Sequence, residues 1–343
     1  MVQEMEYVNL GPSGLKVSRL CLGTWFLPRL SEVDEYGVPK VDVDEFRRIM
    51  RRAVDEGLNF IDTANRYHGA QSPVDLNHVG NAERVLGKVL KDYDREMFVI
   101  VTKVCGRMAP WPNGAGLSRK HIMWQIKQSL QRLQTDYVDV YLTHVPDPST
   151  PKLETLRALN DLVTRGLVHY IGSSNEPPEG IVESMELAKL YNLHSYITIQ
   201  ERYNLLDREI EKTKIPIAKH YGLAIMAYSP LAQGLLTPKY LKGVPELSRA
   251  KLTSWLGKYL TKDNLQVIRE LNEIAQELDV TLPQLAIAWI LHKEKELGIT
   301  IIPVVGVSKY EHFEDNLAAL DVRLDKDTIE KIEAIAAKFK KPR

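Results

Sequence analysis

The sequence has no net charge and no long hydrophobic run. Its 343 residues include 45 basic and 45 acidic side chains, so the formal net charge is zero. A protein that mainly binds nucleic acid or an anionic membrane usually presents a basic face, so we expect neither partner. No stretch approaches the roughly 18 apolar residues of a membrane-spanning helix, and "MVQEMEYVNLGPSG" lacks the apolar core of a signal peptide. These absences predict a soluble, cytoplasmic protein.

Cysteine is scarce. Cys21 and Cys105 are the only two, which is too few for a disulfide framework. Both stand in strand-like contexts, so we expect buried free thiols, as in a reducing compartment.

A dinucleotide-binding fingerprint is also missing. A doubly wound α/β sheet usually has a G-x-G-x-x-G turn after its first strand, and this chain has none. It has instead eight short apolar runs separated by helical patterns, at residues 19–25, 59–64, 98–104, 137–144, 168–175, 195–200, 223–229 and 298–306. Runs that are apolar on both faces are typical of parallel strands under helices. Eight of them predict an α/β fold, a (β/α)8 TIM barrel, as one domain over residues 1–343.

The segments between the runs have recognisable ends. Helices are expected over residues 42–57, 118–133, 149–166, 215–222 and 281–293, and Thr150 is the expected N-cap of the third. Residues 7–18 predict a β-hairpin that plugs the N-terminal end of the barrel. Residues 231–262 predict a long excursion, which in a compact domain is usually a lid or a binding loop.

Polar side chains end three of the expected strands. Asp62 follows "NFI", Lys103 follows "FVIVT" and His144 follows "VDVYLT", while Tyr67 lies just beyond Asp62. The C-terminal ends of barrel strands share one face, so these four side chains should converge. Lys103 should hold Asp62 as an ion pair and lower the pKa of the Tyr67 phenol. Tyr67 could then give a proton to a carbonyl oxygen, with His144 orienting the same oxygen.

Each of these residues has another interpretation by itself. Lys103 could be a structural ion-pair member or a Schiff-base nucleophile. His144 could be a hydrogen-bonded structural histidine, and Tyr67 could serve packing. The four together, in this order on successive strands, are far more specific, and Schiff-base chemistry gives Tyr67 no role.

At this point the chain resembles the aldo-keto reductases. The resemblance runs in order through "LGPSGLKVSRLCLGTW", "NFIDTANRY", "VTKV", "YVDVYLTH", "IGSSN", "QERYNLL", "YSPLAQGLLT" and "IIPVVGVSKYEHFEDNLAAL". The family's catalytic tetrad of Asp, Tyr, Lys and His falls on Asp62, Tyr67, Lys103 and His144. The motifs "YNLLDREIE" and "YSPLAQGLL" are similar to the branch that contains potassium-channel β subunits and bacterial general reductases.

The resemblance implies a bound NADPH or NADP+ and a small carbonyl substrate. It implies that Tyr228 stacks on the nicotinamide, that Ser174, Asn175 and Gln200 hold the carboxamide, and that Lys309 favours NADP over NAD. The implied cofactor contacts are Gly23, Thr24, Trp25, Ser174, Asn175, Gln200, Tyr228, Ser229, Pro230, Leu231, Gln233, Gly234, Gly306, Ser308, Lys309, His312, Asp315 and Asn316. His312 stands where the family commonly has Gln or Arg, and Asp315 where it has Glu.

Loops that follow barrel strands face the site and should line the substrate pocket. Trp25 and Phe26 are expected on one wall, with Met108 and Trp111 on the other, which suits carbonyl compounds with apolar bodies. Tyr67 is followed by His68, where the family usually has glycine. His68 and His78 flank a longer loop that we interpret as solvated, with no metal site.

Two functions remain open. The first is an NADPH-dependent reductase of aldehydes and ketones that uses Tyr67 as general acid. The second is an NADP(H)-sensing regulatory subunit like the channel β subunits. A homo-oligomer is compatible with both.

Overall fold

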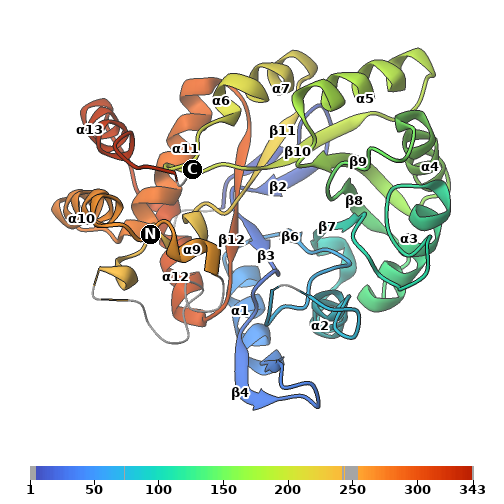
Figure 1. Ribbon diagram of the computed structural model, residues 1–343, viewed down its shortest axis with the longest axis horizontal. Helices are drawn as coiled ribbons and strands as arrows, with labels where there is room; N and C mark the ends of the chain where they lie inside the picture. Colours follow the sequence, from blue (N-terminus) through green and yellow to red (C-terminus); the bar gives the residue numbers. More distant parts are fainter. Residues whose placement is uncertain (1–4, 73, 242, 244–253, 342–343) are drawn as a thin grey trace.

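The computed structural model describes residues 5–72, 74–241, 243 and 254–341. Its centre is a closed barrel of eight parallel strands in the order β10-β11-β12-β3-β6-β7-β8-β9 (Figure 1). In chain order these strands are β3 (Cys21–Gly23), β6 (Phe60–Asp62), β7 (Val99–Val104), β8 (Val138–Thr143), β9 (Val168–Ser174), β10 (Tyr196–Arg202), β11 (Ala224–Tyr228) and β12 (Ile301–Gly306). Each lies within or closely overlaps one of the eight predicted runs. The predicted (β/α)8 barrel is therefore confirmed.

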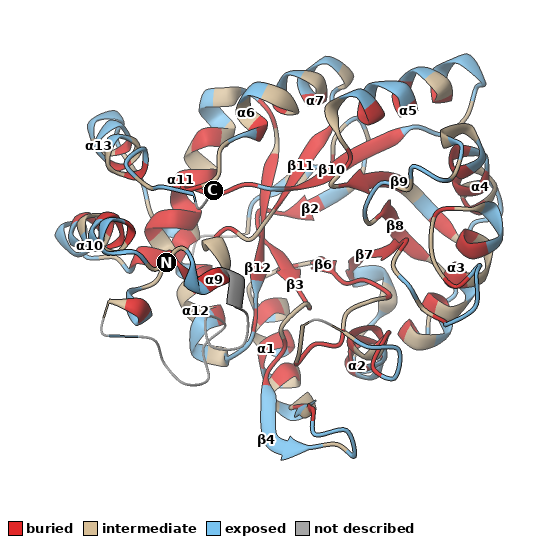
Figure 2. Ribbon diagram, in the orientation of Figure 1, coloured by how far each residue is buried: buried red, intermediate tan, exposed pale blue. Residues whose placement is uncertain are grey.

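Helices surround the barrel, most of them with their buried faces turned toward it (Figure 2). They are α1 (Val43–Asp55), α2 (Asn81–Leu90), α3 (Arg119–Leu133), α4 (Lys152–Thr164), α5 (Pro178–Leu190), α6 (Ile210–Thr213), α7 (Ile215–Tyr221), α9 (Ser254–Gly257), α10 (Lys262–Glu277), α11 (Leu282–Leu297), α12 (Tyr310–Ala318) and α13 (Lys326–Ala336). Short 3-10 turns are η1 (Arg95–Met97), η2 (Ala232–Gly234), η3 (Pro238–Tyr240) and η4 (Ala319–Asp321).

The starts of α1 and α3 follow from their sequences. Asp42 and Ser118 cap α1 and α3 by accepting hydrogen bonds from main-chain N–H groups in the first turn. The expectation that Thr150 caps α4 was wrong. Pro151 is the N-cap of α4, and the Thr150 hydroxyl instead donates to the Asp147 carboxylate at 2.7 Å.

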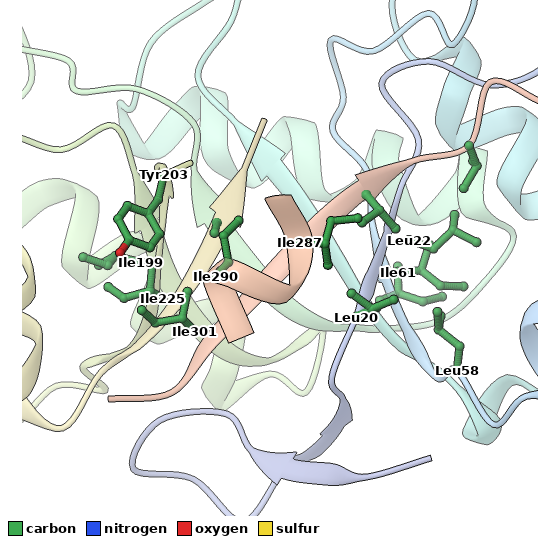
Figure 3. Packing of buried hydrophobic residues seen from close by; sticks show 14 of the residues in the cluster. Leu20, Leu22, Leu58, Ile61, Ile199, Tyr203, Ile225, Ile287, Ile290 and Ile301 are labelled. Atoms are coloured by element: carbon green, nitrogen blue, oxygen red, sulfur yellow. The ribbon is translucent and has the colours of Figure 1, made fainter. Parts of the chain in front are cut away.

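Two apolar layers hold the barrel together. The outer layer lies between strands and helices. In it, Ile287 and Ile290 of α11 pack among strand residues such as Leu22, Ile225 and Ile301 (Figure 3). The inner layer fills the barrel with Phe60, Val99, Val101, Val140 and Leu142 and with their counterparts on the other strands. Alternate residues of each strand therefore face opposite layers.

The predicted N-terminal hairpin is confirmed. β1 (Tyr7–Asn9) and β2 (Lys16–Ser18) pair antiparallel, and the buried Leu10 and Val17 join the inner layer. Gly11 makes this contact possible because its φ is +61° and a Cβ there would collide with the Ile197 carbonyl oxygen. The hairpin closes one end of the barrel with apolar side chains.

A second antiparallel hairpin was not predicted. β4 (Arg29–Val33) and β5 (Pro39–Val41) follow the first barrel strand and project from the molecule (Figure 1). All residues of β4 are exposed. The predicted excursion over residues 231–262 contains η2, η3 and α9, and its residues 242 and 244–253 lie outside the described part of the chain.

Both cysteine side chains are buried free thiols, as predicted. Within the described residues, no helix is long and apolar enough to cross a membrane.

Candidate active site

The alternation of the strands brings the predicted tetrad together. Phe60, two residues before Asp62, faces the barrel interior, so Asp62 faces it too. Lys103 follows Val99 and Val101 on the inner face in the same way, and His144 follows Val140 and Leu142. Because the inner layer ends at this height, each side chain points into the C-terminal mouth of the barrel. β6, β7 and β8 are neighbours, so the three groups stand side by side.

Lys103 is the centre of this group. Its side chain is completely buried, and Nζ donates to Asp62 Oδ2 at 2.8 Å, to the Thr63 carbonyl oxygen at 2.8 Å and to the Tyr67 hydroxyl at 3.2 Å. An ammonium group has three N–H bonds, so each has a partner. The expected ion pair with Asp62 is present, with Nζ also 2.7 Å from Oδ1.

Gln200 gives Asp62 a second partner that the sequence did not reveal. Its Nε2 donates to Asp62 Oδ1 at 2.7 Å. β10, which carries Gln200, lies four strands from β6 in either direction around the barrel. The amide therefore spans the mouth, and its nitrogen is committed to Asp62 in this structure. Lys103 and Gln200 together hold the buried carboxylate.

Tyr67 lies between aromatic neighbours above Lys103. Its ring stacks on Trp25, with centroids 6.1 Å apart and planes at 19°, and meets the His144 ring edge-on at 5.6 Å. The Lys103 ammonium group lies 4.7 Å from the Tyr67 ring centroid. These contacts fix the hydroxyl at the mouth.

The expected low pKa of Tyr67 was wrong. Burial raises the pKa of Tyr67 to about 12, and the attraction of Lys103 opposes this rise only in part. The phenol is therefore protonated at neutral pH. The phenol is still more acidic than an alcohol, so transfer of its proton to an alkoxide oxygen is favourable in free energy.

His144 is a neutral imidazole. Burial lowers its pKa to about 3, and the positive charges of Lys103 and Arg66 add to this effect. Neither ring nitrogen has a hydrogen-bond partner among the residues that the structure describes. One ring N–H is thus available for an oxygen atom at the mouth, next to the Tyr67 hydroxyl.

The residues expected at the nicotinamide end form one connected group. Asn175 Nδ2 donates to the His144 carbonyl oxygen at 2.9 Å and to Ser174 Oγ at 3.0 Å. Asn175 Oδ1 accepts a hydrogen bond from the Tyr228 hydroxyl at 2.7 Å. This chain of contacts links the strand ends of β9 and β11 to the tetrad.

Thr24 supplies an unmet polar group at the same mouth. It follows Gly23 and is fully buried, and its Oγ1 has no hydrogen-bond partner within the described residues. Its main-chain N–H donates to the Asp62 carbonyl oxygen at 2.9 Å. A buried hydroxyl without a partner is costly and fits a ligand contact, so this position suits a polar group of a cofactor.

The turn after β11 holds the residues expected at the pyrophosphate, Ser229, Pro230, Leu231, Gln233 and Gly234. Ser229, Gln233 and Gly234 all have positive φ angles, of 56°, 59° and 94°. The ammonium group of Lys239 lies against Gly234, where a side chain would meet it. Lys239 was missed in the sequence because no periodic pattern marks it, and its cation suits a phosphate.

The segment after β12 holds the residues expected at the adenosine end. Asn316 Nδ2 donates to the Gly306 carbonyl oxygen at 3.3 Å, and Ser308 Oγ is 3.4 Å from His312 Nδ1. Burial lowers the pKa of His312, and the charges of Lys309 and Lys239 lower it further. The charges of Lys309 and Lys239 therefore both act on His312, in the exposed first turn of α12.

Asp315 has another partner in this segment. Its Oδ1 accepts hydrogen bonds from Thr281 Oγ1 and Gln284 Nε2, both at 2.8 Å. These two residues form the capping box at the start of α11. One carboxylate oxygen of Asp315 is thus used to fix α12 against α11.

The expected walls of the substrate pocket differ in their packing. Trp25 and Phe26 are half-buried, with ring centroids 5.8 Å apart. Met108 is half-buried, whereas Trp111 is 54% exposed and packs on Trp124 of α3 at 5.7 Å. Trp111 is therefore held against the first turns of α3.

The interpretation of the loop at His68 and His78 as solvated was wrong for both histidines. They are 4% and 6% exposed, and their rings meet edge-on at 5.0 Å. His78 Nδ1 lies 2.7 Å from Asp75 Oδ1, and His78 Nε2 lies 2.7 Å from Asp34 Oδ2 in the β4–β5 hairpin. These contacts clip the loop to the hairpin. In the described ranges, no group of three or more His, Cys, Asp or Glu residues is arranged to hold a metal ion.

Comparison with known proteins agrees with this geometry. Residues 19–337 match the model of the Aldo/keto reductase family. The chain is 36% identical to a probable voltage-gated potassium channel subunit beta of Oryza sativa subsp. japonica over 340 residues, 96% of each chain. It is 37% identical to a putative voltage-gated potassium channel subunit beta of Schizosaccharomyces pombe, covering 95% of this chain and 92% of that one. A probable subunit of the same kind from Arabidopsis thaliana is 36% identical, covering 98% and 99%. The branch indicated by the sequence motifs is thus confirmed.

Proposed function

The chain belongs to the aldo/keto reductase family, and on this premise we propose that it reduces aldehydes and ketones to alcohols with NADPH. The observation that carries the proposal is the hydrogen-bonding of Lys103, whose ammonium group joins the Asp62 carboxylate to the Tyr67 hydroxyl. A structural ion pair would need only the first of these contacts. The second places a cation against a phenol that can lose a proton.

The proposed reaction uses the chain's residues to orient the substrate and to move one proton. The cofactor, when bound, supplies a hydride to the carbonyl carbon. The substrate oxygen accepts hydrogen bonds from the Tyr67 hydroxyl and from the neutral His144 ring. Tyr67 donates its proton to the oxygen as negative charge develops there. Lys103 stabilises the phenolate that remains, and Asp62 keeps the ammonium group in place.

The cofactor would lie across the mouth from the tetrad to α12. Thr24 and Asn175 would bind the nicotinamide end beside Tyr228, and the turn at Ser229–Gly234 would bind the pyrophosphate. Lys309 and Lys239 would meet a 2′-phosphate. Two cations at that position should favour NADPH over NADH by about 1–3 kcal/mol.

The cofactor preference can be measured directly. Dissociation constants of NADPH and NADH, from quenching of tryptophan fluorescence, should differ by about fivefold or more in the parent. Lys309→Met should narrow the ratio and leave NADH binding nearly unchanged. Equal constants for the two cofactors would contradict the proposed 2′-phosphate contact.

A second function is favoured by the names of the relatives. Proteins named as potassium channel β subunits match nearly the full chain, so the pocket could sense NADP(H) as part of a regulatory subunit. Such a sensor needs the cofactor contacts but no turnover. This proposal, like the first, assumes one domain over residues 1–343 in the cytoplasm, with a homo-oligomer as a compatible assembly.

One experiment separates the two functions. NADPH absorbance at 340 nm is followed with a panel of aliphatic and aromatic aldehydes, while NADPH binding is measured on the same preparation. A reductase should consume NADPH with at least some aldehydes, and Tyr67→Phe should slow this consumption by about 10²–10⁴. Binding of NADPH without consumption across the panel would favour the sensor.

A further inference from the structure

Beside the tetrad, the Arg66 side chain contacts the main chain of Arg107, and neither guanidinium forms an ion pair among the described residues. Arg66 directly precedes Tyr67, and its guanidinium donates to the Arg107 carbonyl oxygen and, at 2.8 Å, to the Val74 carbonyl oxygen. Arg107 Nη1 donates to the carbonyl oxygens of Ala109 at 3.0 Å and Trp111 at 3.3 Å. No carboxylate forms an ion pair with either guanidinium within the described residues. Both groups are held by main-chain carbonyls alone.

The fold makes room for this arrangement. The Arg66 side chain crosses Gly106, where a Cβ would lie only 2.7 Å from Arg66 Cδ. A larger residue at position 106 would therefore displace Arg66. Gly106 lies three residues after Lys103, so the Arg66 side chain passes over the loop that follows β7.

The two positive charges disfavour each other. Burial lowers the pKa of Arg66, and the charge of Arg107 lowers it further, whereas the charge of Asp75 opposes both effects in part. Asp75 forms its hydrogen bond with His78, at 2.7 Å, and Asp147 accepts hydrogen bonds from Leu117, Ser149 and Thr150. A carboxylate supplied by a ligand would add the negative charge that no ion pair gives Arg66 among the described residues.

Arg66 lies next to Tyr67 in the chain. Burial lowers the pKa of His144, and the positive charges of Lys103 and Arg66 lower it further. Each guanidinium carries five N–H donors. Arg66 and Arg107 use only some of them for main-chain carbonyls, and the remaining donors have the forked geometry that binds a carboxylate.

We propose that Arg66 and Arg107 form a carboxylate subsite, so the preferred substrates are carbonyl compounds that carry a carboxylate a short distance from the aldehyde or ketone. The inference rests on the proposed reductase function. It adds a substrate class that the apolar walls at Trp25 and Phe26 would not select. In the bound state, the substrate carboxylate relieves the repulsion between the two guanidinium groups.

Arg66 could instead serve only to hold the loops at Val74 and Arg107 together. A structural role of this kind would affect charged and uncharged substrates equally. A carboxylate subsite would affect only the charged one. Matched substrates of equal shape therefore distinguish the two roles.

The test compares 4-carboxybenzaldehyde with its neutral methyl ester at saturating NADPH. In the parent, kcat/KM for the acid should exceed that for the ester by about tenfold or more, mainly through KM. Arg107→Met and Arg66→Met should bring this ratio close to one, with the ester changed only a few-fold, and Arg66→Lys should retain part of it. Arg84→Met is the matched control, because Arg84 also donates to a main-chain carbonyl, that of Val79 at 3.0 Å. It should keep the parent ratio.

The failure of this inference differs from the failure of the proposed function. A parent that reduces both aldehydes at equal efficiency is a reductase without the subsite, and so is one whose ratio survives Arg107→Met. If the parent reduces neither aldehyde, binding of 4-(hydroxymethyl)benzoate and its methyl ester to the NADP+ complex decides. Tighter binding of the acid that is lost in Arg107→Met supports the subsite, whereas equal binding overturns it. Arg107 is exposed, so this variant should fold even if Arg66→Met does not.

Discussion

The two ends of the barrel interior are built from opposite kinds of side chain. At the N-terminal end, the β1–β2 hairpin inserts Leu10 and Val17 against the apolar inner layer. At the C-terminal end, the same inward-facing positions carry Asp62 and Lys103, both buried. One end gains stability by removing apolar surface from water. The other buries two charges, which is stabilising only while each retains its partner.

The N-terminal end of the barrel interior therefore serves mainly stability, and the C-terminal end serves mainly chemistry. Changes at the plugged end should lower the free energy of unfolding without altering the catalytic step. Changes at the mouth should alter the catalytic step, and they should alter stability only where they leave a buried charge alone.

Tyr67→Phe removes one hydroxyl from the mouth and no buried charge. We expect carbonyl reduction to fall by about 10²–10⁴, because the positioned acid is lost, while NADPH binding stays within a few-fold of the parent. Steady-state rates and fluorescence titration measure the two quantities. A variant that turned over within a few-fold of the parent would show that another group or a water molecule supplies the proton.

Lys103→Met tests the buried pair. The variant keeps the volume of the side-chain stem and leaves Asp62 with Gln200 alone, so the free energy of unfolding should fall by about 3–5 kcal/mol and activity should collapse. The double variant Asp62→Asn/Lys103→Met should recover much of the stability and none of the activity. Urea denaturation of the parent, both single variants and the double variant gives the coupling energy. A double variant as unstable as Lys103→Met would mean that the two residues are not energetic partners.

Leu10→Ala tests the plugged end. Leu10 is fully buried, and truncation of a buried leucine costs about 2–5 kcal/mol. We expect that loss in urea denaturation at 25 °C together with a kcat close to that of the parent. Tyr7→Phe is a milder control, because it removes only the hydrogen bond to the Gly57 carbonyl oxygen at 2.6 Å. A large fall in kcat for Leu10→Ala would break the separation between the two ends.

The sequence was sufficient for the barrel and for the tetrad. Apolar runs with short spacings determine strand number, and the two-residue alternation places Asp62, Lys103 and His144 on the inner face. The sequence did not predict contacts between strands that are distant in the chain. The bond from Gln200 to Asp62 joins residues 138 positions apart and depends on closure of the barrel, which no local pattern encodes.

Two further features depend on how deeply groups are buried. The pKa of Tyr67 was predicted to fall because Lys103 is near, but burial has the larger effect and raises it. The β4–β5 hairpin was missed because its first strand is exposed on both faces and therefore lacks the alternation that marks a half-buried strand. Because the hairpin was not predicted, its Asp34 could not be identified as a partner of His78.

The clip around His78 gives the smallest effect and tests the rim of the mouth, where polar groups serve neither the chemistry nor the inner layer. Burial alone would lower the pKa of His78, but hydrogen bonds to Asp34 and Asp75 outweigh it, so the pKa is raised. The pKa values of both carboxyl groups are lowered, that of Asp34 chiefly by the Val38 N–H and that of Asp75 by His78 and Asn77 against the effect of burial. A raised histidine pKa stabilises the fold fully below the ordinary value of about 6.5, and this stabilisation is lost as pH rises through the folded value. A lowered carboxyl pKa stabilises above about 3.9, and this stabilisation is lost as pH falls through the folded value. The contacts of His78 with Asp34 and Asp75 should therefore be most stabilising between about pH 4 and pH 6.5.

His78→Gln, compared with the parent by urea denaturation at pH 5.5 and pH 9, should lower the free energy of unfolding by about 1 kcal/mol or less at pH 5.5 and by still less at pH 9. His194→Gln, at an exposed position away from the clip, should show no such difference. A loss for His78→Gln that was equal at both pH values would mean that His78 acts by packing alone, and the rim would then resemble the plugged end of the barrel.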